Sequence, residues 1–342
     1  MHGIKRTHLS KDAKLRKLEK DKVKIKTYRS LQDDVLDLKD SLVFDQMALD
    51  KTTKLLDLNP EFYTIWNYRR DILINYVLKD KSLEDLKKII SDELLFTMTQ
   101  LKKFPKCYCI WNHRVWMLSY DKKISNWDIE LMTVSKMLDL DSRNFHGWHY
   151  RRFIISSMES LIDKDDLYSL VLINLKELSY TSKMINRNIS NYSAWHNRSK
   201  LVVKLFEQLL NADYTNILQR LEQEKIQNNN NNNIIDEYIN NFKLFENLKN
   251  FINLEIDLLI NAIFTDAEDS SVWVYMRWVL SSKFFYDKLS KDEYLQNLNK
   301  MLEKVEELNE LEKDDNNGQN NPWCIKTTTL IKELIRKNSN TL

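Results

Sequence analysis

A short motif built around a tryptophan recurs along most of this chain, and it constrains the fold more than any other feature. In four copies an Arg follows the Trp by three positions, and the copies are 45, 37 and 47 residues apart: Trp66, Trp111, Trp148 and Trp195. A fifth copy around Trp273 places its Arg one position later, and Trp323 marks a degenerate sixth copy. Repeats of this length are typical of paired helices, which must stack because one pair cannot bury its apolar face alone.

Composition restricts the elements of this chain to helices. Three Gly and three Pro in 342 residues leave little with which to build hairpin turns, whereas abundant Leu, Lys, Glu and Ile suit helices. Apolar residues recur every three or four positions on both sides of each Trp. In the first copy, Asn59 and Pro60 predict where a second helix begins. The sequence therefore predicts an all-α superhelix, a solenoid of stacked helical hairpins.

Two parts of the chain depart from the repeat pattern. Residues 1–30 carry eleven Lys or Arg and three Asp or Glu, so that the rest of this chain of net charge +2 is acidic. We predict a basic N-terminal arm over 1–30 and a helical-repeat domain over 31–342. Two interpretations of the arm remain open: a solvated, partly helical segment, or a basic strip that docks on an acidic partner. Six consecutive Asn predict a low-complexity insertion at about 222–236.

Several function classes are disfavoured by composition. A net charge of +2 is unlike a dedicated nucleic-acid binder, and no apolar run reaches the roughly 18 residues that cross a bilayer. Three Cys make neither a disulfide framework nor a four-ligand zinc set, so we expect a reducing, cytoplasmic setting and no metal bound by this chain alone. With three Gly, a Gly-rich phosphate loop or a nucleophile elbow can hardly be built.

The segments just before each Trp are the candidate functional region. In a stack they form a row of helix N-termini, where backbone N–H groups and the helix dipole favour an anion. Lys106, Tyr108, His146 and Tyr192 belong to this row. A Lys at a helix start is unfavourable unless an anion lies opposite, which makes Lys106 a candidate phosphate ligand. The repeated Trp and Arg we interpret as structural.

An acidic motif near the N-terminus has a second possible meaning. Asp33, Asp34 and Asp37 match the pattern with which isoprenoid synthases hold magnesium and diphosphate. No second acidic motif accompanies it, and the chain has 50 acidic residues. We therefore interpret it as structural.

The repeated motifs resemble those of the α subunits of protein prenyltransferases, and within that family they are most similar to the type II, or Rab geranylgeranyltransferase, branch. The resemblance covers nearly the whole chain. The segments that carry it are Met1-His2-Gly3, Asn59-Pro60-Glu61-Phe62 leading to Trp66-Asn67-Tyr68-Arg69-Arg70, Pro105-Lys106-x-Tyr108, Arg143-Asn144-Phe145-His146, Ser190-Asn191-Tyr192-Ser193 and Arg277-Trp278.

This resemblance implies a chain wrapped around a separate β subunit, which holds the catalytic zinc and the lipid. The implied reaction transfers geranylgeranyl from geranylgeranyl diphosphate to C-terminal cysteines of Rab GTPases presented by Rab escort protein. It places Lys106 at the diphosphate, and Tyr108 and His146 near the diphosphate or the subunit contact. It also makes His2 a possible mobile ligand of the partner's zinc.

Departures from the family pattern leave alternatives open. Cys107 and Cys109 stand where the family usually has small or polar residues. The immunoglobulin-like domain and leucine-rich repeats of mammalian-type α subunits do not fit this length. The alternatives are the α subunit shared by farnesyltransferase and type I geranylgeranyltransferase, which the Met-His-Gly start disfavours, and a helical-repeat scaffold without chemistry.

Overall fold

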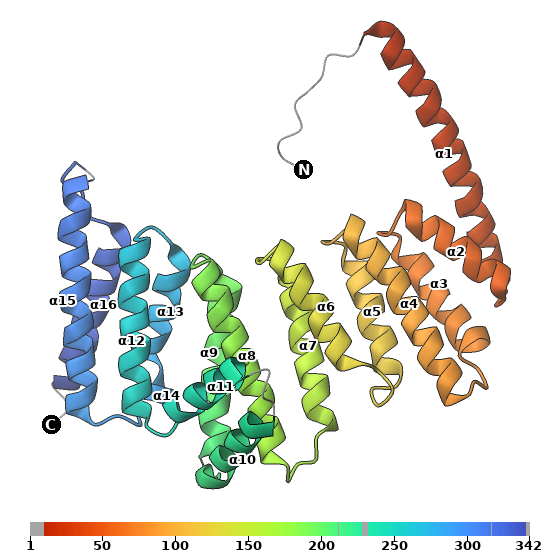
Figure 1. Cartoon of the computed structure of the whole chain (residues 1–342). Coiled ribbons are helices and arrows are strands. Elements are labelled where there is room, and N and C mark those ends of the chain that lie inside the picture. Colours follow the sequence, from red (N-terminus) through yellow and green to blue (C-terminus); the bar gives the residue numbers. More distant parts are fainter. Residues whose placement is uncertain (1–9, 211, 228–231, 316, 340–342) are drawn as a thin grey trace. The chain divides into compact units, whose positions relative to one another are not determined.

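The computed structural model describes residues 10–210, 212–227, 232–315 and 317–339, and within these ranges every regular element is helical (Figure 1). The elements are α1 (Lys11–Asp40), α2 (Gln46–Leu58), α3 (Tyr63–Ile72), the π-helical turn η1 (Leu73–Val77), α4 (Leu83–Lys103), α5 (Tyr108–Tyr120), α6 (Trp127–Leu140), α7 (Phe145–Leu161), α8 (Leu167–Arg187), α9 (Tyr192–Leu209), α10 (Tyr214–Gln227), α11 (Asn232–Leu244), α12 (Leu248–Thr265), α13 (Ser270–Ser281), α14 (Lys283–Tyr286), α15 (Lys291–Asp315) and α16 (Pro322–Ser339). Among the helices of these ranges, none is both long and apolar enough to cross a bilayer.

The chain forms two compact units. The first contains residues up to 132 together with 149–154, and the second contains 133–148 and the residues from 155 onward. Within the first unit, α2 packs against α3 and α4 against α5; within the second, α8 packs against α9, α12 against α13 and α15 against α16. Helices α6 and α7 contribute residues to both units. The predicted class, all-α stacked helical hairpins, is confirmed.

The motif Trp occupies the same place in five hairpins. It is the fourth residue of α3, α5, α7, α9 and α13, and its side chain is at most 4% exposed in each. Trp323 differs, because it is the second residue of α16 and is only partly buried. The α15–α16 hairpin therefore packs without a buried Trp at the fourth position of its second helix.

The second helix of the first repeat begins later than its sequence predicts. Asn59 ends α2 as its C-cap, and α3 starts at Tyr63. The carbonyl oxygen of Pro60 accepts a hydrogen bond of 2.8 Å from Trp66 Nε1, so the intervening residues form a turn and not the first turn of a helix. The prediction that α3 starts at Pro60 was wrong for this reason.

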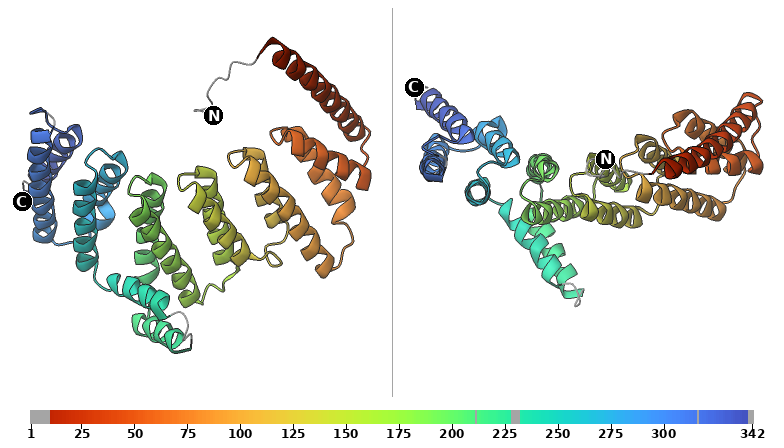
Figure 2. Two further views of the ribbon diagram at one scale, coloured as in Figure 1. Left: turned by 45° about the horizontal axis from the view of Figure 1, so that its top comes forward. Right: turned by 90° about the horizontal axis from the view of Figure 1, so that it is seen from above.

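Two predicted boundaries fall inside helices. The boundary at residue 30 lies within α1, which continues to Asp40. The insertion predicted over 222–236 is helical up to Gln227 and again from Asn232; residues 228–231 lie outside the described part. Buried Leu221, Ile235 and Ile239 explain the difference, because they give α10 and α11 an apolar face. This hairpin projects from α8 and α9 (Figure 2).

Candidate functional site

Each of the five buried Trp side chains fixes the turn that precedes its helix. In every copy the indole Nε1–H donates to the carbonyl oxygen six residues earlier. The pairs are Trp66 to Pro60 at 2.8 Å, Trp111 to Pro105 at 2.9 Å, Trp148 to Ser142 at 2.9 Å, Trp195 to Ile189 at 2.8 Å and Trp273 to Ala267 at 2.9 Å. We call these turns, with the first residue of the following helix, the rim segments. The buried Trp therefore fixes one end of each turn, and rim side chains that bond the backbone, such as Asn144 and Asn191, add to this where they occur.

The Arg three positions after the Trp makes a buried ion pair. Arg69 donates from Nε and Nη2 to the two carboxylate oxygens of Glu93, at 2.6 and 2.7 Å. Its Nη1 donates to Thr52 Oγ1 at 3.0 Å and Thr53 Oγ1 at 2.8 Å. Because Glu93 lies on α4 and the threonines on α2, one guanidinium joins three helices from two repeats.

The same inter-repeat ion pair recurs along the chain. Arg114 binds Glu130 on α6 and Arg198 binds Glu255 on α12, each with both side chains buried. Arg151 and Glu177, at the corresponding positions, are also buried. The glutamates are missing from the sequence-based candidates. A constant interval could have identified them, because each glutamate lies 18 residues before the motif Trp of its own hairpin. The pairs are Glu93 and Trp111, Glu130 and Trp148, Glu177 and Trp195, and Glu255 and Trp273.

A third side chain, two positions after the Trp, completes three of these pairs. Tyr150 and Tyr275 donate their hydroxyls to Glu130 and Glu255, and His113 Nε2 lies 2.7 Å from Glu93 Oε1. Burial lowers the pKa of His113, so its imidazole is neutral and donates from Nε2.

The carboxylate of Glu93 stays ionised in this network. Burial alone raises its pKa, but the charge of Arg69 and hydrogen bonds from Arg69 and His113 outweigh that effect and lower the pKa to about 2. The repeated Trp and Arg are thus structural, as the sequence predicted.

Lys106 and Tyr108, two of the predicted site residues, lie on either side of Cys107 in the rim segment before α5. Lys106 is exposed, two residues before α5 begins, and Tyr108 is the first residue of α5 with 59% of its surface exposed. Tyr63, Phe145 and Tyr192 hold the corresponding positions in α3, α7 and α9, and each is more than half exposed. Each of these rim segments therefore presents an aromatic side chain to solvent, and the α5 and α7 segments each add an exposed cation, Lys106 and Arg143.

The two cysteines beside Lys106 hold this rim segment against the preceding repeat. Cys107, the N-cap of α5, donates its thiol to the Pro60 carbonyl at 3.3 Å, and Cys109 lies 3.8 Å from the Glu61 carbonyl. Burial raises the pKa of both thiols, to about 11 for Cys109, so neither is a thiolate at neutral pH. The bond from Cys107 matches that of Asn191, whose Nδ2 donates to the Ser142 carbonyl at 2.9 Å.

His146, the third predicted site residue, belongs to the second unit. It is the second residue of α7 and only 6% exposed, its backbone N–H donates to Asn144 Oδ1 at 3.1 Å, and its ring lies 3.9 Å from that of Phe145, measured between centroids. Tyr192 stacks on His196 with centroids 6.0 Å apart. His146 is thus held in the rim by its neighbours, whereas Tyr108 is open to solvent.

The acidic motif and His2 were the two places where the sequence suggested contact with a metal. The acidic motif lies on α1, where Asp34 pairs with Lys51 of α2 at 2.9 Å. Within the described ranges, no group of three or more His, Cys, Asp or Glu side chains is placed to hold a metal ion. His2 lies outside these ranges.

A known family model matches this chain repeat by repeat. The family model for the protein prenyltransferase alpha subunit repeat matches residues 45–76, 90–121, 127–158, 174–205 and 252–283. Each match contains one of the five buried Trp side chains and, in all but the first, the glutamate that precedes it at the constant interval.

Similar proteins extend over nearly the whole chain. A Candida albicans protein named geranylgeranyl transferase type-2 subunit alpha is 42% identical over 99% of this chain and 89% of its own length. A protein of the same name from Saccharomyces cerevisiae is 36% identical over 98% of this chain and 89% of its length. The mouse protein of that name is 32% identical over 84% of this chain, which spans 43% of the mouse sequence.

A solved structure shares the fold. Candida albicans protein geranylgeranyltransferase-I complexed with GGPP contains a chain that superposes with a TM-score of 0.53, at 20% identity, over 92% of this chain and 91% of that one.

Proposed function

Because this chain belongs to the family of geranylgeranyl transferase type-2 α subunits, we propose that it is the α subunit of a heterodimeric Rab geranylgeranyltransferase. The enzyme transfers geranylgeranyl from geranylgeranyl diphosphate to C-terminal cysteines of Rab GTPases, which Rab escort protein presents in the cytoplasm. The observation that carries this proposal is similarity at 42% identity to a type-2 α subunit over 99% of the chain. The five repeats, each with its Trp buried, support it independently.

The proposed division of labour gives the zinc and the lipid to a β subunit. Zinc held there lowers the pKa of the substrate thiol and so supplies the attacking thiolate. This chain contributes a rigid rim, because its turns are fixed by buried Trp side chains and its inter-repeat ion pairs are shielded from water. A rigid rim can place charges where the diphosphate leaves.

We assign the diphosphate contact to Lys106. Its side chain is exposed beside the start of α5, where the helix dipole disfavours a cation and favours an anion. A leaving diphosphate gains negative charge in the transition state, and a fixed cation stabilises it there more than in the ground state. Tyr108 has a hydroxyl that can donate to the same anion, and His146 is the third candidate in this role.

Co-expression with a type-2 β subunit tests the proposal. We expect a stable heterodimer that prenylates a Rab protein only when escort protein and geranylgeranyl diphosphate are present. A chain that binds no β subunit would instead be a non-catalytic scaffold. Transfer of farnesyl, or of geranylgeranyl without escort protein, would indicate the alternative prenyltransferase classes.

Lys106→Ala tests the assigned residue. We expect kcat to fall about 100-fold, the usual effect of removing a charge-stabilising group from a transition state. Lys88→Ala, which removes an exposed cation from α4, is the matched control and should leave the rate unchanged. Full activity of Lys106→Ala, in a heterodimer of normal stability, would refute the diphosphate role without refuting the heterodimer.

A further inference from the structure

Helix α1 continues well beyond the repeats that support it. From Tyr28 onward it is packed: the Tyr28 hydroxyl accepts a hydrogen bond of 2.9 Å from Asn59, and Val35 is fully buried. Over residues 12–27, every side chain except those of Ala13 and Asp21 is solvent-exposed. In Figures 1 and 2 the N-terminal part of α1 lies away from α2 and α3. We call residues 12–27 the projecting segment.

The projecting segment is too charged to be stable alone. Its side chains include seven Lys or Arg and three Asp or Glu. Even Ala-rich helices are marginal in water below about 12–15 residues, and this segment of 16 residues is only slightly longer and is not rich in Ala. Continuity with the packed half of α1 removes the cost of helix nucleation, so the segment is ready to bind but gains little stability within this chain.

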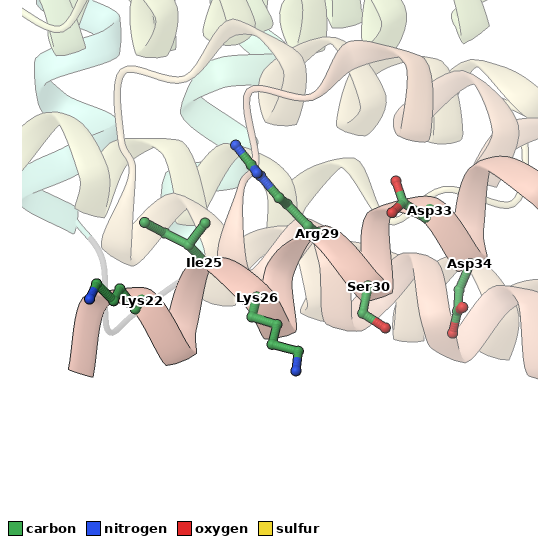
Figure 3. Close-up of a pocket in the computed structure, with 7 residues that line it drawn as sticks. All are labelled: Lys22, Ile25, Lys26, Arg29, Ser30, Asp33 and Asp34. Atoms are coloured by element: carbon green, nitrogen blue, oxygen red, sulfur yellow. The ribbon is translucent and has the colours of Figure 1, made fainter. Parts of the chain in front are cut away.

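One stripe of the projecting segment carries exposed apolar side chains. Leu15, Leu18 and Ile25 are 62%, 55% and 52% exposed. Their spacing of three and seven residues places them on one side of the helix, in line with Lys22 and Arg29. Figure 3 shows Ile25 and Arg29 pointing to the same side of α1, along an open hollow whose other lining residues are Lys22, Lys26, Ser30, Asp33 and Asp34.

This pattern fits a protein groove better than the other possible occupants. A second copy of the segment would bring two net positive helices together, and like charges repel. A membrane surface requires a broad apolar face, whereas this stripe is narrow and is interrupted by Lys22. A groove with an apolar floor and acidic edges matches both the stripe and the surrounding cations.

We propose that the projecting segment docks by its Leu15–Leu18–Ile25 stripe in an acidic-edged groove of the β subunit. This inference rests on the proposed heterodimer, since the β subunit is the macromolecule that an α subunit holds permanently. Docking orders the segment and buries the stripe, and its cations contribute a salt-dependent part of the affinity.

Hydrogen exchange on the full-length chain, free and in the heterodimer, tests the docking. We expect the backbone amides of 12–27 to exchange at least about tenfold more slowly in the heterodimer. Unchanged exchange in an intact heterodimer would overturn this inference and leave the proposed function standing. Failure of the wild-type chains to associate would overturn both. Slower exchange with phosphatidylserine vesicles but not with the β subunit would also overturn it, in favour of a membrane.

A matched pair of variants tests the stripe. The substitution Ile25→Asp should raise the Kd for the β subunit about tenfold or more and weaken the protection. Val23→Asp is the control, because Val23 is 66% exposed on the opposite side of the same helix. Equal effects of the two variants would overturn the proposal, and circular dichroism of each free chain excludes general unfolding as the cause.

Discussion

Two sets of positions in one motif have opposite environments although they are close neighbours in the sequence. Trp111 and Arg114 are buried and bonded in the α5 repeat as their counterparts are in other repeats. Lys106 and Tyr108, just before them, are exposed on a turn that the buried positions fix. The comparison shows that buried Trp and Arg side chains help to hold the turn that carries Lys106 and Tyr108, so that these two exposed side chains can change without loss of the fold. Substitutions in the core should therefore reduce stability, and those in the rim should reduce activity.

The largest loss of stability should come from Glu93→Ala. It leaves the buried charge of Arg69 without its carboxylate and His113 without its acceptor. We expect a loss of about 3–5 kcal/mol in urea unfolding, the usual effect of removing one partner of a buried ion pair. Asp92→Ala, at the exposed neighbouring position, should cost less than about 0.5 kcal/mol. Similar losses in both variants would contradict the structural role of the pair.

Acid should weaken the same pair. The pKa of Glu93 is lowered from 4.5 to about 2 on folding, so its stabilising contribution is complete above pH 4.5 and is lost as the pH falls through 2. That contribution is about 3 kcal/mol in all. Urea unfolding between pH 5 and 3 should show a steeper loss of stability for the wild type than for Glu93→Gln, which has no proton to bind. Parallel losses would show that other carboxylates dominate.

A smaller loss should follow from Trp195→Phe. The substitution retains an aromatic ring but removes the N–H that donates to the Ile189 carbonyl. Loss of a hydrogen bond to this partly buried acceptor costs about 1 kcal/mol. Trp323→Phe, at a partly exposed position, should cost less than about 0.5 kcal/mol in the same thermal or urea experiment. An equal cost at both positions would mean that the hydrogen bond to Ile189 is not the cause.

The smallest effect on stability should come from the rim. Tyr108→Phe removes one exposed hydroxyl, and we expect unfolding to change by less than about 0.5 kcal/mol. If the hydroxyl donates to the diphosphate, kcat of the heterodimer should still fall about tenfold. Wild-type turnover in Tyr108→Phe would remove Tyr108 from the site and leave Lys106 as the assigned contact.

The fold was predictable because its repeating unit is visible in the sequence. A Trp that recurs with an Arg three residues later, in a chain with three Gly, indicates stacked helical hairpins without any coordinates. Local boundaries were less predictable. Pro60 has the residue type of a helix start, but a tertiary hydrogen bond from Trp66 uses its carbonyl and delays α3 to Tyr63.

The candidate site was predictable only in part. Lys106 was selected because a cation is unfavourable at a helix start unless an anion lies opposite, and its contact with the diphosphate stays a prediction. The glutamates that pair with the motif Arg residues were not identified from the sequence, because their spacing varies. Arg69, Arg114 and Arg198 precede their glutamates by 24, 16 and 57 residues. No fixed Arg–Glu spacing exists to be recognised, because loops and the α10–α11 hairpin intervene. The interval from each Glu to its own Trp is constant, since both lie within one hairpin.

The inter-repeat ion pairs also make the five repeats directional. In the ion pairs described above, the glutamate of a repeat binds the Arg of the repeat before it. The first repeat has Ala48 at the glutamate position, and the fifth has Met276 at the Arg position, both fully buried. A duplicated inner repeat would bring both halves of a new pair, whereas a first repeat moved inward would leave a buried Arg facing an alanine. Such an array can lengthen from its middle, but its ends cannot be exchanged.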